Sequence, residues 1–144
     1  MVIVRDRVRF VETDMMGVVH HANYLRWFEM GRVAYLRQAG VYLLDLMAAG
    51  IVFPIMDVSC TYRAPARFDD CLAVETTMAE LSKAKMVFTY RVVREADGVL
   101  LAEGRTRNAF TDEAGKVIRL PAEYYGPLQA MFAGEAEGTR VGNS

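Results

Sequence analysis

The feature that most restricts the fold of this chain is a long apolar helix predicted over Ala22–Ala39. The segment contains no proline, and Gly40 lies where a helix is expected to end. Apolar side chains occupy most of the helix circumference, and polar ones are few. Such a helix is buried rather than laid on a surface, so another part of the chain must wrap around it.

The segments around this helix predict strands. Residues 2–11 alternate at first and are rich in valine, and longer extended segments follow at 51–62, 72–81, 85–95 and 99–110. Ala96-Asp97-Gly98 predicts a hairpin between the last two of these. Within the segment 99–110, the small residues Ala102, Gly104 and Thr106 share one face, where they would let a helix come close.

The order of strand, buried helix and hairpin-linked strands predicts an α+β fold with a strongly curved antiparallel sheet. A short second helix is expected over residues 42–49 and a short final strand over 116–120. Sheet curvature alone need not cover the helix and protect the edge strands, and a symmetric partner is the usual remedy.

The C-terminal part predicts one more helix and a tail. Pro121 favours a helix start, and Gly126-Pro127 would bend or break that helix. Residues 134–144 are polar and rich in glycine, which predicts a flexible C-terminal tail. We therefore expect a single domain over residues 1–133.

Composition excludes several classes of protein. The 144 residues are 53% hydrophobic and 24% charged, which suits one domain with a real core. A formal net charge of -1 does not favour nucleic acid as a partner. No apolar run approaches the ~20 residues of a membrane span, and the N-terminus lacks a secretory pattern. With Cys60 and Cys71 read as free thiols, we expect a cytoplasmic protein without membrane insertion.

One polar cluster, residues 12–24, is the candidate site, since nucleotide-binding, serine-hydrolase and zinc-protease motifs are absent from the sequence. Asp14 precedes a predicted helix N-terminus, whose unpaired N–H groups can stabilise an oxyanion. A carboxylate there can attack an acyl carbon or activate water. Gly17 permits the tight turn that would bring the loop to the helix.

The same cluster has structural interpretations. From spacing alone, Asp14 is more often a turn or capping residue, and His20 and His21 are more often surface or packed residues. A metal site made by these three is weakly supported, because adjacent histidines rarely converge on one ion. The spacing of Arg26, Glu29 and Arg32 indicates a paired polar stripe on the helix.

A longer pattern resembles the hotdog-fold acyl-CoA thioesterases, in their 4-hydroxybenzoyl-CoA thioesterase and Tol-Pal-associated branches. The pattern is Val8-x-Phe10-x-x-Thr13-Asp14-x-x-Gly17-x-Val19-x-His21-x-Asn23-Tyr24-x-x-x-Phe28-Glu29-x-x-Arg32. A second match is Tyr62-Arg63-Ala64-Pro65-Ala66 followed by Asp69-Asp70. The resemblance spans residues 2–121 and implies a hotdog fold, a sheet wrapped around a long central helix.

The resemblance implies roles for four residues of the cluster. Asp14 is the catalytic carboxylate, acting as nucleophile or as general base on water. The backbone N–H of His21 polarises the thioester carbonyl, and its imidazole adds a contact. Gly17 shapes the loop, and Tyr24 lines the pocket. The implied reaction is hydrolysis of an acyl-CoA to a carboxylic acid and free CoA, with no cofactor or metal.

The resemblance also implies partners. The active site forms across a homodimer, and dimers assemble into a homotetramer. Arg63, Lys83, Lys85 and Arg91 are candidates to bind the CoA phosphates. Met15-Met16 stands where small residues are common, which suggests an altered acyl pocket. Two alternatives remain open: a hotdog hydratase-dehydratase acting on acyl-CoA or acyl-carrier protein, and a non-catalytic acyl-CoA-binding dimer.

Overall fold

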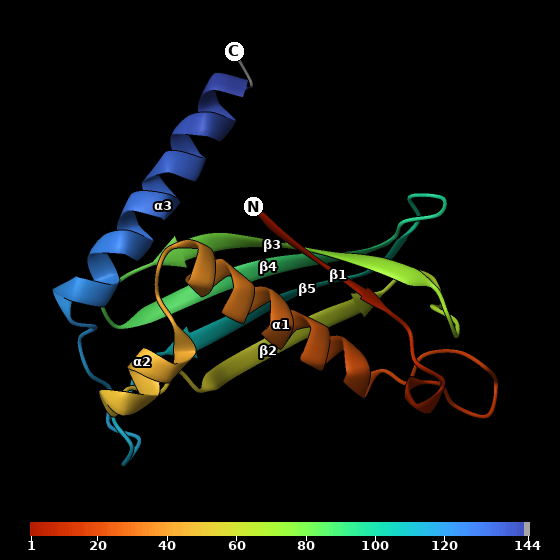
Figure 1. Ribbon diagram of the computed structural model, residues 1–144, viewed down its shortest axis with the longest axis horizontal. Helices are drawn as coiled ribbons and strands as arrows, with labels where there is room; N and C mark the ends of the chain where they lie inside the picture. The colour runs from red at the N-terminus through yellow and green to blue at the C-terminus, as the bar shows by residue number, and fades with distance from the viewer. Residues whose placement is uncertain (143–144) are drawn as a thin grey trace.

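The protein is a curved antiparallel sheet with one long helix across its concave face, as Figure 1 shows. The computed structural model describes residues 1–142, with side chains described up to residue 135. The strand order is β1-β3-β4-β5-β2. The strands are β1 (Val2–Arg7), β2 (Ile55–Tyr62), β3 (Cys71–Leu81), β4 (Lys85–Arg94) and β5 (Leu100–Ala109). The helices are α1 (Ala22–Gln38), α2 (Leu43–Ala48) and α3 (Ala122–Gly142), with a short 3-10 turn η1 (Phe10–Glu12).

The core lies between α1 and the sheet. Trp27, Phe28 and Tyr35 of α1 are fully buried, and they pack on the inward side chains of β4, among them Phe88 and Tyr90. The Phe28 and Tyr90 rings stack with centroids 4.3 Å apart. The predicted α+β hotdog architecture is confirmed, because the curved sheet wraps the apolar helix that the sequence predicted.

Two glycines let the helix come this close. A Cβ placed on Gly31 of α1 would overlap the Thr76 hydroxyl on β3. A Cβ on Gly104 of β5 would lie 2.5 Å from the Phe28 ring and 2.8 Å from the Ser59 carbonyl oxygen. The prediction of a small-residue face at Ala102, Gly104 and Thr106 is therefore confirmed.

Several predicted boundaries were wrong. β1 ends at Arg7, because η1 turns the chain before residue 11. Residues 116–120 do not form a strand; Val117 makes a single bridge to Thr111. α3 continues through Pro127. Proline cannot donate the helical hydrogen bond to the carbonyl four residues earlier, but that carbonyl belongs to Glu123, an exposed residue near the start of the helix.

The flexible C-terminal tail expected over residues 134–144 stays a prediction. The backbone of α3 is helical to Gly142, and the last two residues lie outside the described part of the chain. α3 projects away from the sheet and is held at its base by the buried Leu128. Tyr35 of α1 also donates a hydrogen bond to Glu135 at 2.9 Å. Within residues 1–142, no helix is long and apolar enough to cross a membrane.

The sheet leaves one side of α1 uncovered. Leu25 is 40% exposed, and Met30 and Val33 are half-buried beside open pockets. β2, at the sheet edge next to this side, has almost every residue exposed, including Ile55 and Val58. The prediction that one sheet does not fully cover the helix is therefore confirmed within this chain.

We predict that Gly31→Ala and Gly104→Ala each lower the free energy of unfolding by about 2 kcal/mol or more, because the added methyl group overpacks the helix-sheet contact. Gly134→Ala is the matched control, since α3 leaves open space around Gly134. Alanine there should stabilise by about 0.5–1 kcal/mol. Urea unfolding of the three variants measures the difference, and equal effects at all three sites would contradict the packing argument.

Candidate active site

The Asp14 carboxylate closes a tight turn between η1 and α1. Its Oδ1 accepts hydrogen bonds from the backbone N–H of Met16 at 2.8 Å and of Val18 at 3.4 Å. Gly17 completes the turn with φ of +78°, a conformation that favours glycine. Among the described residues Oδ2 of Asp14 has no partner, so one oxygen shapes the loop and the other is available.

The loop is tied to the start of α1 by its own backbone. The Glu12 carbonyl accepts hydrogen bonds from the His20 N–H at 2.8 Å and from the Asn23 side chain at 3.0 Å. The Glu12 carboxylate is buried and paired with Arg9 and Arg26. These contacts fix the segment between residues 12 and 23 against the helix, and so they hold the Asp14 loop in one position.

His21 lies at the N-terminus of α1. Its imidazole stacks on the Tyr62 ring of β2, with centroids 4.1 Å apart and planes 16° apart. The Ala22 N–H contacts the His20 imidazole, and the Asn23 N–H bonds the His20 carbonyl. The described residues offer the His21 N–H no acceptor, so it is the donor at this helix end that remains free for an oxyanion.

His21 also lines a pocket of about 270 Å³. His21, Tyr24, Tyr62 and Arg63 line it, together with the loop that follows β2 and with Val18. Asp14 does not line the pocket itself. Its backbone N–H donates to the carbonyl of Val18 at 2.8 Å, and Val18 lines the pocket. Three of the predicted residues, His21, Tyr24 and Arg63, thus meet at one pocket, with Asp14 and Gly17 in the adjoining loop.

Tyr24 is buried in the wall of this pocket. Burial is the main cause that raises the pKa of Tyr24 to about 12, with smaller contributions from the nearby ionisable groups Cys60, Tyr62 and Asp70. Its ring packs edge-on against Trp27 and Tyr62. The phenol is therefore neutral at physiological pH and serves the pocket as a rigid polar wall.

Comparison with known proteins places this geometry in a family. Residues 8–129 match the model of the thioesterase-like superfamily. The chain belongs to this superfamily. The match includes the Asp14 loop, all of α1 and the complete sheet except β1.

Individual relatives agree with this assignment. A putative esterase of Aquifex aeolicus is 34% identical over 84% of this chain and 92% of its own length. The acyl-CoA thioester hydrolase YbgC of Escherichia coli O157:H7 is 37% identical over 67% of this chain and 72% of its own. Among solved structures, a DHNA-CoA thioesterase from Staphylococcus aureus superposes with a TM-score of 0.83, at 27% identity over 99% of this chain and 94% of that one.

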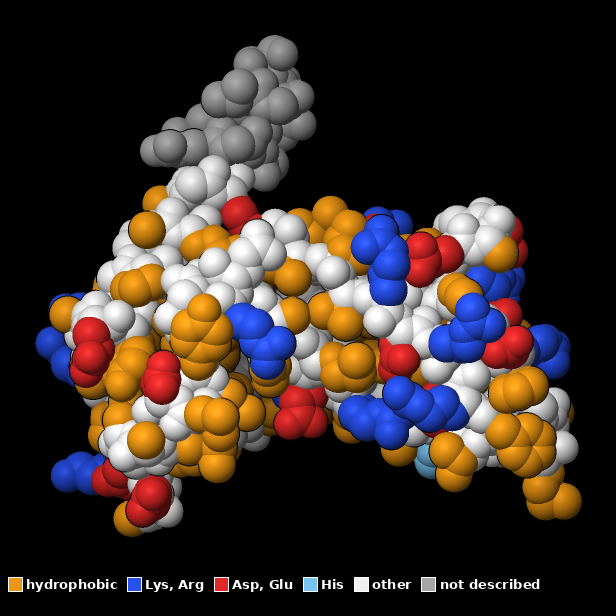
Figure 2. Space-filling view, in the orientation of Figure 1, with side chains coloured by type: hydrophobic (Ala, Val, Ile, Leu, Met, Phe, Trp, Pro, Cys, Tyr) orange, Lys and Arg blue, Asp and Glu red, His pale blue; other side chains and the backbone are white. Residues whose placement is uncertain are grey.

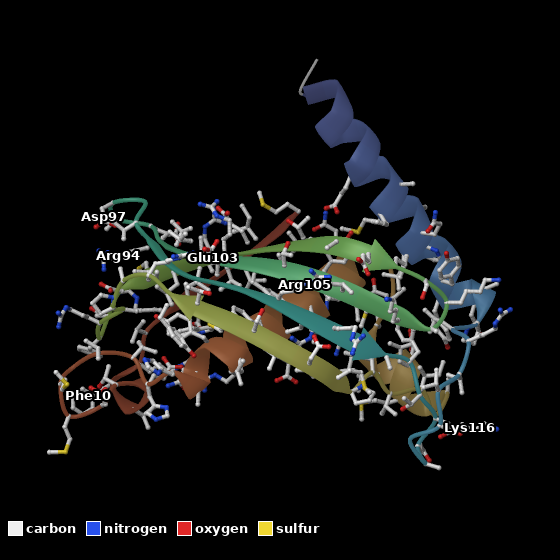
Figure 3. All side chains as sticks on the ribbon, turned by 180° about the vertical axis from the view of Figure 1, so that it is seen from behind. Phe10, Arg94, Asp97, Glu103, Arg105 and Lys116 are labelled. Carbon is white, nitrogen blue, oxygen red and sulfur yellow. The ribbon has the colours of Figure 1, made fainter. Side chains whose placement is uncertain are left out.

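The basic residues predicted to hold CoA phosphates are spread over this thioesterase-like chain. Arg63 lines the pocket and pairs with Glu103 at 2.5 Å, and Figure 3 shows Glu103 beside Arg105 on the outer face of β5. Lys83 and Lys85 lie at the β3–β4 hairpin, an 11-residue strand away from the Asp14 end, or roughly 33 Å. Within one chain, these two lysines are not brought to the pocket.

The predicted polar stripe on α1 was wrong. Arg26 pairs with Glu12, outside the helix, and Glu29 has no ion pair among the described residues. Arg32 is 4% exposed and donates to the Tyr90 hydroxyl at 3.1 Å. Helical spacing showed that the three share a face, but it could not show that Arg32 is buried while Arg26 and Glu29 are exposed.

The residues that the sequence missed are Glu12, Asn23 and Tyr62 as contacts of the site. Asn23 and Tyr62 belong to the quoted motifs, but spacing does not reveal their hydrogen bonds or stacking. No group of three or more His, Cys, Asp or Glu side chains in the described part of the chain is arranged to hold a metal ion. Met15 and Met16 point to solvent within this chain, at 106% and 81% exposure.

The raised pKa of Tyr24 predicts a loss of stability in alkali. Unfolded tyrosine loses its proton near pH 10, whereas folded Tyr24 keeps it to about pH 12. The folded state binds more protons in this window, so stability is complete below pH 10 and falls as the pH rises toward 12. Tyr24→Phe should make the melting temperature fall less steeply there than in the parent, and Tyr42→Phe, at a half-exposed site, is the control. Parallel curves for parent and Tyr24→Phe would refute this.

Proposed function

We propose that the protein hydrolyses acyl-CoA thioesters to a carboxylic acid and free CoA, with Asp14 as the catalytic carboxylate. The observation that carries this proposal is the free His21 N–H at the start of α1, held next to the Asp14 loop and a pocket. Membership of the thioesterase-like superfamily and the relatives named as acyl-CoA thioester hydrolases support the reaction.

The proposed reaction uses one donor and one carboxylate. The thioester carbonyl accepts the His21 N–H, and the positive end of α1 stabilises the oxyanion that develops. Asp14 either takes a proton from the attacking water or attacks the carbon itself. In both routes the C–S bond then breaks, and the CoA thiolate leaves and takes up a proton. In the second route this step leaves a mixed anhydride, which water cleaves. In our proposal, this chemistry requires no metal or redox cofactor.

Asp14→Asn tests the carboxylate. Asparagine keeps a side-chain oxygen that can accept the two hydrogen bonds of the turn, so the fold should persist. We expect kcat/KM to fall by about 10²- to 10⁴-fold. The measurement is the release of CoA thiol, followed with DTNB across a panel of acyl-CoAs.

The chain provides a matched control for this variant. Asp112 closes the same turn elsewhere: its Oδ1 accepts from Ala114 at 3.0 Å and from Lys116 at 2.9 Å, and Gly115 has φ of +88°. Asp112→Asn should leave activity unchanged. If Asp14→Asn is as active as the parent, the mechanism is wrong. If the parent releases no thiol from any acyl-CoA, the non-catalytic binding dimer gains, and dehydration of a hydroxyacyl-CoA would favour the hydratase.

We further propose that the protein is a homodimer joined at the β2 edge. Two observations support it: β2 is an exposed edge strand, and the side of α1 next to it is left uncovered. Exposed apolar side chains also cover α2, at the lower left of Figure 2, including Leu44 and Met47. This second surface supports pairing of dimers into a homotetramer, in which a partner can bring Lys83 or Lys85 to the CoA phosphates.

Val58→Lys tests the β2 edge. A charge in the middle of this strand should disfavour pairing with a second copy, so light scattering should show a mass near the 16.2 kDa of one chain instead of a multiple of it. Ile3→Lys is the control, because Ile3 lies on the opposite edge strand β1 with similar exposure. A parent protein that is already monomeric would contradict the proposal.

A further inference from the structure

Arg94, the last residue of β4, connects the β4–β5 hairpin to the loop that follows β2. Its Nε and Nη2 donate to the two carboxylate oxygens of Asp97, at 3.1 and 2.9 Å. The remaining nitrogen, Nη1, donates to the Pro65 carbonyl at 3.4 Å and lies 3.6 Å from Oδ2 of Asp70. Figure 3 shows Arg94 and Asp97 together, at the same end of the molecule as Phe10. One guanidinium thus joins two segments of the chain that are distant in sequence.

The β4–β5 hairpin fixes the direction of this side chain. The Arg94 N–H donates to the Val99 carbonyl at 2.9 Å, and Oδ1 of Asp97 accepts the Val99 N–H at 3.2 Å. A planar guanidinium that binds both oxygens of a carboxylate has a defined orientation. The Arg94 side chain is also only 22% exposed. Nη1 is therefore directed at the neighbouring loop instead of being left free in solvent.

Pro65 is the residue of this loop that depends most on Arg94. The residues before it, Arg63 and Ala64, donate their N–H groups to one carbonyl of β5, at 2.8 and 3.2 Å. Pro65 has no N–H, so its carbonyl is the one backbone group that can hold it. In the described part of the chain, Arg94 is the donor found for that carbonyl. All three loop residues line the pocket at His21, so Arg94 fixes part of its wall.

The same loop is bonded to the Asp14 loop. The Ala66 carbonyl accepts the Val19 N–H at 2.8 Å, and Val18 forms a β-bridge with Arg67. The Asp14 N–H donates to the Val18 carbonyl at 2.8 Å, and the Val18 N–H donates to Oδ1 of Asp14 at 3.4 Å. A series of hydrogen bonds and adjacent residues therefore leads from the guanidinium to the proposed catalytic carboxylate.

We propose that Arg94 is a positioning residue for the reaction, which holds residues 63–67 in place and thereby sets the position of the Asp14 carboxylate relative to the His21 N–H. This inference rests on the proposed thioesterase function. Arg94 does not line the His21 pocket, and it has no bond to the Asp14 loop among the described residues, so it acts through the two loops. Such an effect is large enough to measure, because a misplacement of about 1 Å can lower a rate by roughly 100-fold.

A surface ion pair is the simpler interpretation of Arg94. Exposed pairs of arginine with aspartate contribute little to stability, and they have no reason to affect the geometry of another site. The two interpretations differ in one measurable quantity. A surface pair affects unfolding alone, whereas a positioning residue affects the turnover of the folded protein.

Arg94→Met keeps the aliphatic stem and removes the donors. We expect kcat, measured by the release of CoA thiol at a temperature where the variant is fully folded, to fall about 10-fold. KM should change by less than about two-fold, because Arg94 contributes no group to the pocket. An unchanged kcat would overturn the proposal. A rise of KM at constant kcat would also overturn it, because Arg94 would then be a binding residue.

Arg5→Met is the matched control. Arg5 of β1 pairs with Glu95, the residue after Arg94, at 3.2 Å, and no bond from it to residues 63–70 is found within residues 1–135. The substitution therefore removes an arginine ion pair at the same hairpin without reaching the pocket wall. It should leave kcat unchanged, and an equal fall of kcat in both variants would contradict the proposed route.

A double-mutant cycle with Asp97 tests that route directly. Asp97→Asn keeps an oxygen for the Val99 N–H and loses the second carboxylate oxygen that orients Arg94. We expect kcat to fall in the parent background, by a smaller factor than in Arg94→Met, and not to fall further in the Arg94→Met background. Equal falls in both backgrounds would overturn the proposal. If Arg94→Met does not fold, kcat of the single variant Asp97→Asn decides.

Hydrogen exchange separates this inference from the proposed function. The Val19 N–H, which is bonded to the Ala66 carbonyl, should exchange about 10-fold faster in Arg94→Met than in the parent, and at the parental rate in Arg5→Met. If the parent hydrolyses acyl-CoA while kcat and Val19 exchange are the same in Arg94→Met, the thioesterase function stands and the positioning role is rejected. If Val19 exchanges faster but the parent hydrolyses no acyl-CoA, the thioesterase function fails and the coupling of the two loops is supported.

Discussion

The structure depends on the close approach of α1 to the sheet. The Phe28 ring lies so near β5 that only a glycine fits beneath it, and Gly31 lies so near β3 that a methyl group would overlap Thr76. This contact buries the large aromatic side chains of the core and brings the N-terminus of α1 to the end of β2. The pocket at His21 and Tyr62 exists because these two elements are held together there.

Much of this arrangement follows from periodicity. An apolar helix without proline, hairpin turns and a run of small residues in one strand were enough to predict the sheet, the central helix and their contact. The boundaries that failed are ones that a local pattern does not determine: α3 continues past Pro127, and Val117 forms an isolated bridge to Thr111 instead of a strand. A local pattern cannot show whether a segment has a strand to pair with or a surface to lie on.

The candidate site was predicted less completely, and Asp14 shows why. Its turn occurs twice, at Asp14–Val18 and at Asp112–Lys116. Both turns have the same pattern of hydrogen bonds to the aspartate, and a glycine with positive φ at the fourth position. The local sequence thus accounts for the turn and gives no reason to prefer one aspartate. What distinguishes Asp14 is its place in the loop that leads to the start of α1, where the His21 N–H has no acceptor among the described residues; the longer family pattern indicated this and spacing did not. The burial of Glu12 and Arg32 was equally hidden, because charged residues are usually solvated.

The length of α1 has a consequence for how such a protein can change over time. The proposed carboxylate and oxyanion donor lie in the loop before the helix and at its first residue, whereas Arg32 lies three turns further along and contacts neither of them. Substitutions at the distant end can accumulate without touching the reacting atoms. Those at the near end are restricted by the Asp14 turn and by the hydrogen bonds of the Glu12 carbonyl to His20 and Asn23. Descendants of one ancestral chain can therefore differ in the substrates that they accept, while the residues proposed to break the thioester bond stay unchanged.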